Sequence, residues 1–165
     1  PPSDWSPGTG WLTSTASAGD AIELSQVMGP GFKIHDAPEQ NILLFAAGPG
    51  IAPIRSAIED ASERGLRGRN VHLFYGARTP DHLAYASKFA EWESLGVKVT
   101  PCVSQPEGTG WDGATGYVQD VARTAGISEP ASTAILVCGM KGMFEGVKKL
   151  ASDVAIPEDR ILANF

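Results

Sequence analysis

The sequence predicts an α/β protein built on a five-stranded, parallel, doubly wound sheet. From residue 39 onward, short apolar runs alternate with segments whose apolar residues have helical spacing. The chain has 165 residues, of which 42% are hydrophobic, enough for one domain with a sizeable core. Strands that alternate with helices favour a parallel sheet with right-handed crossovers.

The first two strand–helix pairs are predicted between residues 41 and 95. Residues 41–47 read NILLFAA, a continuous apolar run typical of a strand buried on both faces. Residues 54–64 have apolar side chains at helical spacing. A second strand is predicted at 71–75 (VHLFY), and a helix at 83–95.

The remaining elements complete the predicted sheet. We expect a third strand at 97–103, a short helix at 117–124 and a fourth strand at 134–138, which reads AILVC. A helix at 143–154 and a short fifth strand at 160–165 end the chain. No internal repeat is visible.

The first 37 residues have a different composition from residues 38–165, which we take as the main domain. Pro, Gly, Ser and Thr dominate up to Asp20, and the chain does not begin with Met. Residues 21–27 (AIELSQV) alternate apolar and polar, as a half-buried antiparallel strand does. A single strand cannot form a domain, so we expect it to pair with a preceding segment that the chain lacks, or to dock on the rest.

Composition excludes several classes of function. The formal net charge of −6 disfavours a nucleic-acid surface, which needs basic residues. The apolar run 42–47 is far too short to span a membrane, and the first residues do not read as a signal peptide, since no charged region followed by an apolar one occurs there. Two cysteines and three histidines show neither a disulfide framework nor zinc-ligand spacing, so no metal site is predicted.

The carboxyl ends of the strands are the expected binding edge, because ligands of open parallel sheets bind there. After the first strand, residues 48–53 read GPGIAP; such small residues let a backbone approach a pyrophosphate at a helix N-terminus. The alternative is a plain tight turn. Arg78 follows the second strand, either as a cation at the binding edge or as an ordinary surface arginine.

The third and fourth strands are also followed by candidate binding segments. Residues 104–113 form a long Gly-rich loop, which favours binding over a bare connection. Cys138 ends a strand beside a glycine turn, a position that favours a cofactor contact over a purely structural role. His35, His72 and His82 form no hydrolase arrangement and are expected to be structural or exposed.

Four of these motifs, in this order, resemble the C-terminal half of the ferredoxin–NADP reductase family of flavoproteins. Residues 48–53 resemble its pyrophosphate loop, and 74–78 (FYGAR) its second strand and loop. Residues 116–120 (GYVQD) resemble its adenosine-side segment, and 138–143 (CGMKGM) its nicotinamide-side motif. Residues 19–32 resemble the last strand of the flavin-binding barrel. The general look is that of a plant and algal branch of the family.

The resemblance implies a Rossmann-like NAD(P)-binding half of an FAD-dependent oxidoreductase that transfers hydride between nicotinamide and flavin. Tyr117 would stack on adenine, and Ser104 would face the ribose or its 2′-phosphate. Cys138 would lie beside the nicotinamide, and Phe165 on the flavin face. The pyrophosphate would be held by Gly48, Pro49, Gly50, Ile51, Ala52 and Pro53, and further cofactor contacts would come from Gly76, Ala77, Arg78, Gln105, Gly139, Met140 and Met143.

Departures from the family pattern affect the expected cofactors. Pro49 stands where the family has Thr or Ser, Gln105 where NADP-using members have Arg, and Thr115 where plant-type enzymes have Lys. A 2′-phosphate is best held by arginine, so NADH is favoured over NADPH. The flavin-binding motif is absent from these residues. FAD is therefore expected only together with the missing N-terminal barrel, and the chain alone should be inactive.

A second, non-enzymatic reading stays open at this point. The same fold could serve as a reductase-like subunit or docking module of a larger, photosynthetic complex. The net charge of −6 disfavours an acidic ferredoxin as the electron-transfer partner, since ferredoxins need a basic docking face. By resemblance, a soluble protein of the plastid stroma is expected.

Overall fold

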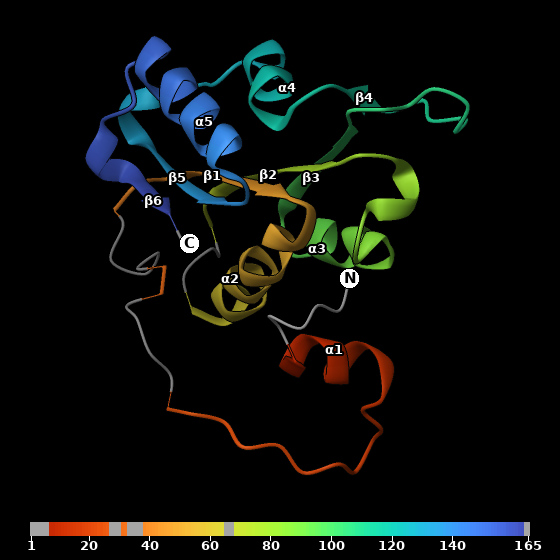
Figure 1. The fold of residues 1–165 in the computed structure, drawn as a ribbon. Helices are drawn as coiled ribbons and strands as arrows, with labels where there is room; N and C mark the ends of the chain where they lie inside the picture. Colours follow the sequence, from red (N-terminus) through yellow and green to blue (C-terminus); the bar gives the residue numbers. More distant parts are fainter. Residues whose placement is uncertain (1–6, 27–30, 33–37, 65–67, 164–165) are drawn as a thin grey trace.

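A computed structural model describes residues 7–26, 31–32, 38–64 and 68–163, which form a parallel six-stranded sheet flanked by helices (Figure 1). The strand order is β4-β3-β2-β1-β5-β6. The strands are β1 Asn41–Ala47, β2 Asn70–Ala77, β3 Val97–Val103, β4 Ala114–Thr115, β5 Thr133–Cys138 and β6 Ile161–Ala163. The predicted parallel, doubly wound sheet is confirmed; the two-residue β4 adds a strand that the sequence did not indicate.

The described residues also form α-helices. They are α1 Pro7–Ser14, α2 Ile51–Arg64, α3 Phe89–Ser94, α4 Val118–Ala125 and α5 Lys141–Asp153. In Figure 1, α2 and α3 lie on one face of the sheet, and α4 and α5 lie on the other. This two-sided cover matches the right-handed crossovers expected for parallel strands.

The central strand β1 divides its side chains between two separate cores. It pairs in parallel with β2 on one side and β5 on the other. Ile42 and Leu44 belong to the hydrophobic cluster beneath α2 and α3. Leu43 and Phe45 belong to the cluster beneath α4 and α5. Because successive strand side chains point to opposite faces, a strand with a layer of helices on each face must be apolar throughout.

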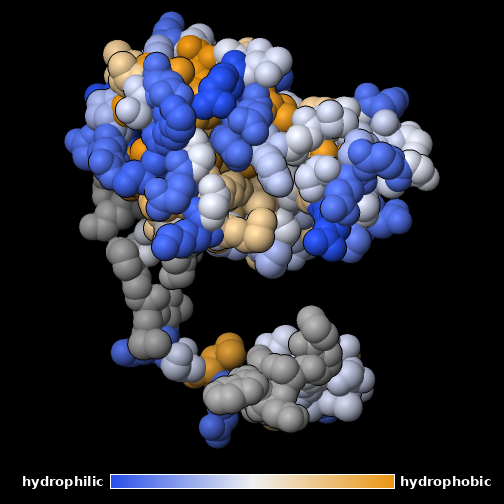
Figure 2. Space-filling model, turned by 45° about the horizontal axis from the view of Figure 1, so that its top comes forward, coloured by the Kyte–Doolittle hydropathy of each residue, from blue (hydrophilic) through white to orange (hydrophobic). Residues whose placement is uncertain are grey.

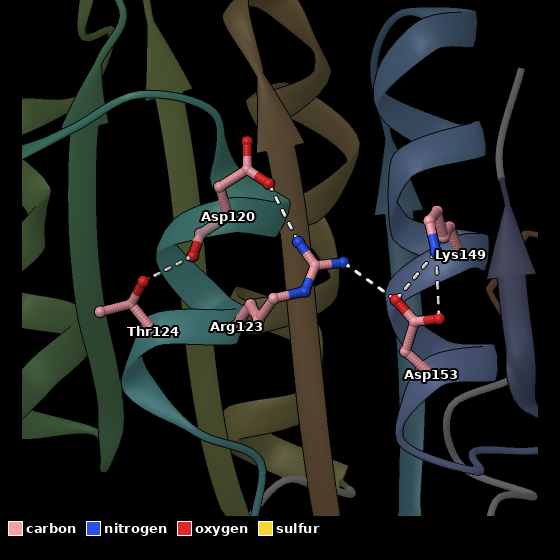
Figure 3. A network of polar contacts seen from close by, with 5 residues as sticks. All are labelled: Asp120, Arg123, Thr124, Lys149 and Asp153. Carbon is pink, nitrogen blue, oxygen red and sulfur yellow. Dashed lines mark hydrogen bonds and ion pairs between the residues drawn. The ribbon is translucent and has the colours of Figure 1, made fainter.

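Helices α4 and α5 pack closely through a glycine. A side chain on Gly146 would come within 3.0 Å of Gln119, so the glycine permits the approach. Nearby, Arg123 contacts Asp120 at 3.1 Å and Asp153 at 3.2 Å (Figure 3). These charges are exposed and add little stability. Hydrophilic side chains likewise dominate the face shown in Figure 2.

The helix predicted at 83–95 is wrong in its first half. Tyr85 has the left-handed backbone conformation, with φ 59°, which a continuous α-helix cannot contain. Only a short 3-10 turn, Ala86–Lys88, and then α3 follow. The guanidinium of Arg55, from α2, lies 4.8 Å from the centre of the Tyr85 ring, and this contact holds the turn against α2.

The segment before β1 also differs from the prediction. The sequence did not indicate α1. Residues 21–26 form no strand, and residue 27 lies outside the described residues. Ile22 and Leu24 are 55% and 82% exposed, and no described strand lies beside them to accept backbone hydrogen bonds. The assignment of residues 1–37 to a remnant of the flavin-binding barrel and a linker stays a prediction.

No helix among the described residues is both long and apolar enough to cross a membrane.

Candidate functional site

The turns that follow the parallel strands converge on one cavity of about 780 Å³. It is lined by Ala47, Gly48, Gly76, Ala77, Arg78, His82, Ser104, Gln105, Gly116, Tyr117, Val118, Gln119, Met140, Gly142 and Met143. The predicted site residues that the structure brings together here are Gly48, Gly76, Ala77, Arg78, Ser104, Gln105, Tyr117, Met140 and Met143. The parallel topology therefore gathers segments that lie far apart in the sequence.

Other predicted residues do not line this cavity. Pro49, Gly50, Ile51, Ala52, Pro53, Cys138 and Gly139 lie in or next to the same turns but outside the lining. Phe165 lies outside the described residues, and so does His35. The proposed roles of Phe165 at a flavin face and of the other residues at a nucleotide stay predictions.

The turn after β1 is a 3-10 turn, Gly48–Gly50, that leads directly into α2. Gly48 has φ 51°, a conformation that favours glycine, and a side chain there would meet no atom within 4 Å. The backbone N–H of Ile51 donates to the carbonyl oxygens of Gly48 and Pro49. The turn therefore presents Gly48 to the cavity without a side chain.

Gly50 also has a structural role that its sequence context did not suggest. A Cβ on Gly50 would lie 2.7 Å from the carbonyl carbon of Cys138 and closer still to its oxygen. The turns after β1 and β5 thus touch through their backbones at the centre of the sheet edge. A side chain at position 50 would obstruct this internal contact and would therefore lower the stability of the fold.

The loops after β2 and β3 stay paired beyond the ends of the strands. The N–H of Ser104 donates to the carbonyl oxygen of Ala77 at 3.0 Å, and the N–H of Gln105 donates to that of Arg78 at 2.8 Å. Ser104, Gln105 and Arg78 are therefore held together at one end of the cavity. Arg78 is the only lysine or arginine among the described residues that line the cavity.

Tyr117 is placed at the start of α4, with its side chain largely in solvent. The preceding Gly116 has φ 105°, and its N–H donates to the carbonyl oxygen of Val103 at 2.9 Å. The carbonyl oxygen of Tyr117 accepts the N–H groups of Asp120 and Val121, so the residue caps the helix. Its ring is 64% exposed within the cavity lining, which leaves it available for stacking.

Sequence reasoning missed several lining residues, including His82 and Gln119. His82 Nδ1 lies 2.7 Å from Thr79 Oγ1, and this bond orients the ring in the loop after Arg78. In the sequence, Thr79–Pro80 indicates a turn at this point, and this was the available signal for the position of His82. Gln119 Oε1 is buried and has no hydrogen-bond partner in the described part of the chain. The other lining residues that were not named as contacts are Ala47, Gly116, Val118 and Gly142. Of the unnamed residues, Gly116, Val118 and Gln119 lie within the predicted adenosine-side segment 116–120, and Gly142 lies within the predicted nicotinamide-side segment 138–143.

Cys138 lies on the face of the sheet covered by α2 and α3 and is not among the residues that line the cavity. Its partly buried side chain packs against the cluster beneath α2 and α3. Burial raises the pKa of the Cys138 thiol, so the group stays neutral at physiological pH. Met140 and Met143, from the same motif, do line the cavity; Met140 is 69% exposed and Met143 is buried.

The cavity suits a nucleotide better than a metal. Its volume is in the range of small-molecule sites, roughly 300–1,000 Å³. Glycines at four places let a ligand approach the backbone, Arg78 offers a positive charge for phosphate, and Tyr117 offers an aromatic face. No cluster of His, Cys, Asp and Glu that could hold a metal occurs among the residues that the structure describes.

Comparison with known proteins agrees with this arrangement. Residues 44–149 match the oxidoreductase NAD-binding domain family. The chain is 34% identical to fruit protein pKIWI502 of Actinidia deliciosa, over 87% of this chain and 46% of that protein. It is 28% identical to a subunit of the Na(+)-translocating NADH-quinone reductase of Idiomarina loihiensis, over 98% of this chain and 41% of that subunit. The chain thus spans less than half the length of either relative.

A solved structure shows the same fold. The crystal structure of Amycolatopsis cytochrome P450 reductase GcoB superposes with a TM-score of 0.73 at 22% sequence identity, covering 96% of this chain and 47% of that one.

Proposed function

The chain belongs to the oxidoreductase NAD-binding domain family, as the C-terminal, NAD-binding half of ferredoxin–NADP reductase-like flavoproteins, and on that basis we propose that it binds NADH or NADPH for an FAD-dependent oxidoreductase. The observation that carries the proposal is the cavity formed by the turns after the parallel strands. The chemistry supplied by the bound nucleotide and FAD is hydride transfer between nicotinamide and flavin.

In this proposal, the residues of the chain bind and orient the nucleotide. Gly48 gives the pyrophosphate close access to the backbone, and Arg78 offsets its negative charge. Tyr117 stacks on the adenine, and Ser104 hydrogen-bonds the ribose. The contribution of the protein is orientation of the nicotinamide toward the flavin. FAD itself is proposed to be held by a flavin-binding barrel whose last strand residues 19–32 resemble.

NADH is the proposed preferred nucleotide. Gln105 and Thr115 offer no positive charge to a 2′-phosphate, which leaves Arg78 as the one lysine or arginine among the described lining residues that could face it. The similarity to a subunit of an NADH-quinone reductase supports the same choice. The whole protein is proposed to pass electrons to a separate acceptor.

Calorimetric titration of the full chain with NADH and NADPH tests the proposal. Arg78→Gln removes a charge-assisted contact, so we expect NADH affinity to fall about tenfold or more. Tyr117→Ala removes a stacking surface and should weaken binding by roughly three- to tenfold. Arg123→Gln and Leu95→Ala are the matched controls, because these exposed residues lie outside the cavity.

Two results would contradict the proposal. If neither nucleotide bound, the chain would instead fit the non-catalytic subunit or docking module. If the control variants weakened binding as much as the cavity variants, the nucleotide would not occupy this cavity.

A further inference from the structure

Tyr75 is a tyrosine at a fully buried position of β2. Its ring is 0% exposed in the core beneath α2 and α3 and meets the ring of Phe89 edge-on, with centroids 6.3 Å apart. Burying a hydroxyl here costs free energy unless the hydroxyl is hydrogen-bonded. A phenylalanine would fill the same space without that cost, so the hydroxyl calls for an explanation.

The hydroxyl of Tyr75 bonds to two of the turns that form the cavity. It donates to the carbonyl oxygen of Gly48, 3.3 Å away, in the turn after β1. It accepts the N–H of Ala84 at 3.0 Å, in the loop after β2 that also carries Arg78 and His82. One buried atom therefore links the two turns from beneath the cavity.

The bond to Gly48 also fixes the direction of a carbonyl group. Because the Gly48 oxygen accepts from a buried hydroxyl and from the N–H of Ile51, it is directed toward the protein. A carbonyl oxygen turned toward the cavity would repel an anionic ligand. Burial raises the pKa of Tyr75, so its hydroxyl remains a donor at physiological pH.

We propose that Tyr75 is a positioning residue for the nucleotide site: its hydroxyl fixes the Gly48 turn relative to the loop of Arg78 and His82, and holds both in the geometry that binds a dinucleotide. This inference rests on the proposed function of the cavity. Tyr75 itself does not line the cavity, so it would act through Gly48 and Ala84.

Tyr75→Phe in the full chain tests the inference, because it removes one oxygen and keeps the ring. By calorimetry we expect NADH affinity to fall about tenfold, because the variant loses both hydrogen bonds that hold the two turns in the binding geometry. Hydrogen–deuterium exchange without nucleotide should become faster at residues 48–51 and 79–85. This second readout does not depend on any bound ligand.

Two control variants separate positioning from stability. Leu73→Val removes a methylene from the same buried face of β2 and destabilises the core without touching either turn. Tyr85→Phe removes a hydroxyl from a residue outside the cavity and keeps the ring that faces the Arg55 guanidinium. Both should keep NADH affinity within about twofold of wild type, even if Leu73→Val unfolds at a lower temperature.

The outcomes distinguish this inference from the proposed function. If the wild-type chain binds NADH and Tyr75→Phe binds it equally well, with unchanged exchange in both segments, Tyr75 is only a packing residue. If Leu73→Val loses as much affinity as Tyr75→Phe, general destabilisation explains the effect, and the inference is wrong. Absence of NADH binding to the wild type overturns the proposed function and this inference together.

Discussion

Replacing Gly50 by alanine should weaken the backbone contact between the turns that follow β1 and β5. The added Cβ would lie 2.7 Å from the carbonyl carbon of Cys138, whereas carbon atoms in contact are about 3.5–4.0 Å apart. Because the obstructing atoms are backbone, no rotamer relieves the overlap, and the turns must separate by about 1 Å. We expect Gly50→Ala to lower the free energy of unfolding by about 1–3 kcal/mol.

Circular dichroism during heating and in urea measures this loss. For a domain of this size, about 1–3 kcal/mol corresponds to a melting temperature lower by roughly 2–12 °C. Gly142→Ala is one control, because its Cβ meets no atom within 4 Å and alanine favours the helix. Gly48→Ala is the other; it should cost only the about 1–2 kcal/mol of a left-handed alanine.

A Gly50→Ala protein that melted within about 1 °C of the wild type, or at the same temperature as Gly142→Ala, would contradict this prediction. Either result would mean that the turns after β1 and β5 are not in backbone contact.

Three further predictions concern single side chains. Gln105→Arg should raise the affinity for NADPH relative to NADH by about tenfold or more, measured by calorimetry, because it adds a charged partner for the 2′-phosphate; an unchanged ratio would contradict this. Burial and the charge of Lys98 lower the pKa of His72 to about 4. The unfolded chain then binds more protons between pH 4 and 6.5, so stability should fall as the pH drops through that window; an NMR titration with a His72 pKa near 6.5 would contradict it. Burial raises the pKa of Cys102 to about 11, so a thiol reagent at pH 8 should label Cys138 first and Cys102 only after unfolding; equal labelling of both in the folded protein would be inconsistent with the buried position.

The buried strands could be predicted because their signal is local. A strand covered by helices on both faces must be apolar at nearly every position, and residues 41–47 and 134–138 meet this requirement whatever surrounds them. The predicted strand 41–47 matches β1, and the predicted strand 97–103 matches β3. The parallel topology then determined which turns share an edge.

Elements that depend on distant contacts could not be predicted. The break at Tyr85 is accompanied by a contact with Arg55, thirty positions earlier. The apolar spacing of residues 83–95 is that of a continuous helix and indicates neither the break nor the contact. The two residues of β4 have no pattern of their own.

The candidate site shows the same division between local and distant information. Arg78, Ser104 and Tyr117 follow strands or begin a helix, so their place at the edge could be predicted. Side-chain direction could not: Cys138 packs on the α2 side, and Gly50 contacts the neighbouring turn. Both facts depend on how closely the turns after β1 and β5 approach, which no stretch of sequence encodes.

The central position of β1 has a consequence for the order in which the chain folds. Asn41 in β1 bonds Asn70, 29 positions away, but also Ser132, 91 positions away, just before β5. Closing the longer loop costs about 1 kcal/mol more chain entropy, and during synthesis β5 emerges long after β2. Until then, one edge of β1 is an open, apolar template for a wrong partner. We therefore expect nascent or truncated chains that end before residue 133 to depend on chaperones, and the cavity to form only when the last third of the protein has been made.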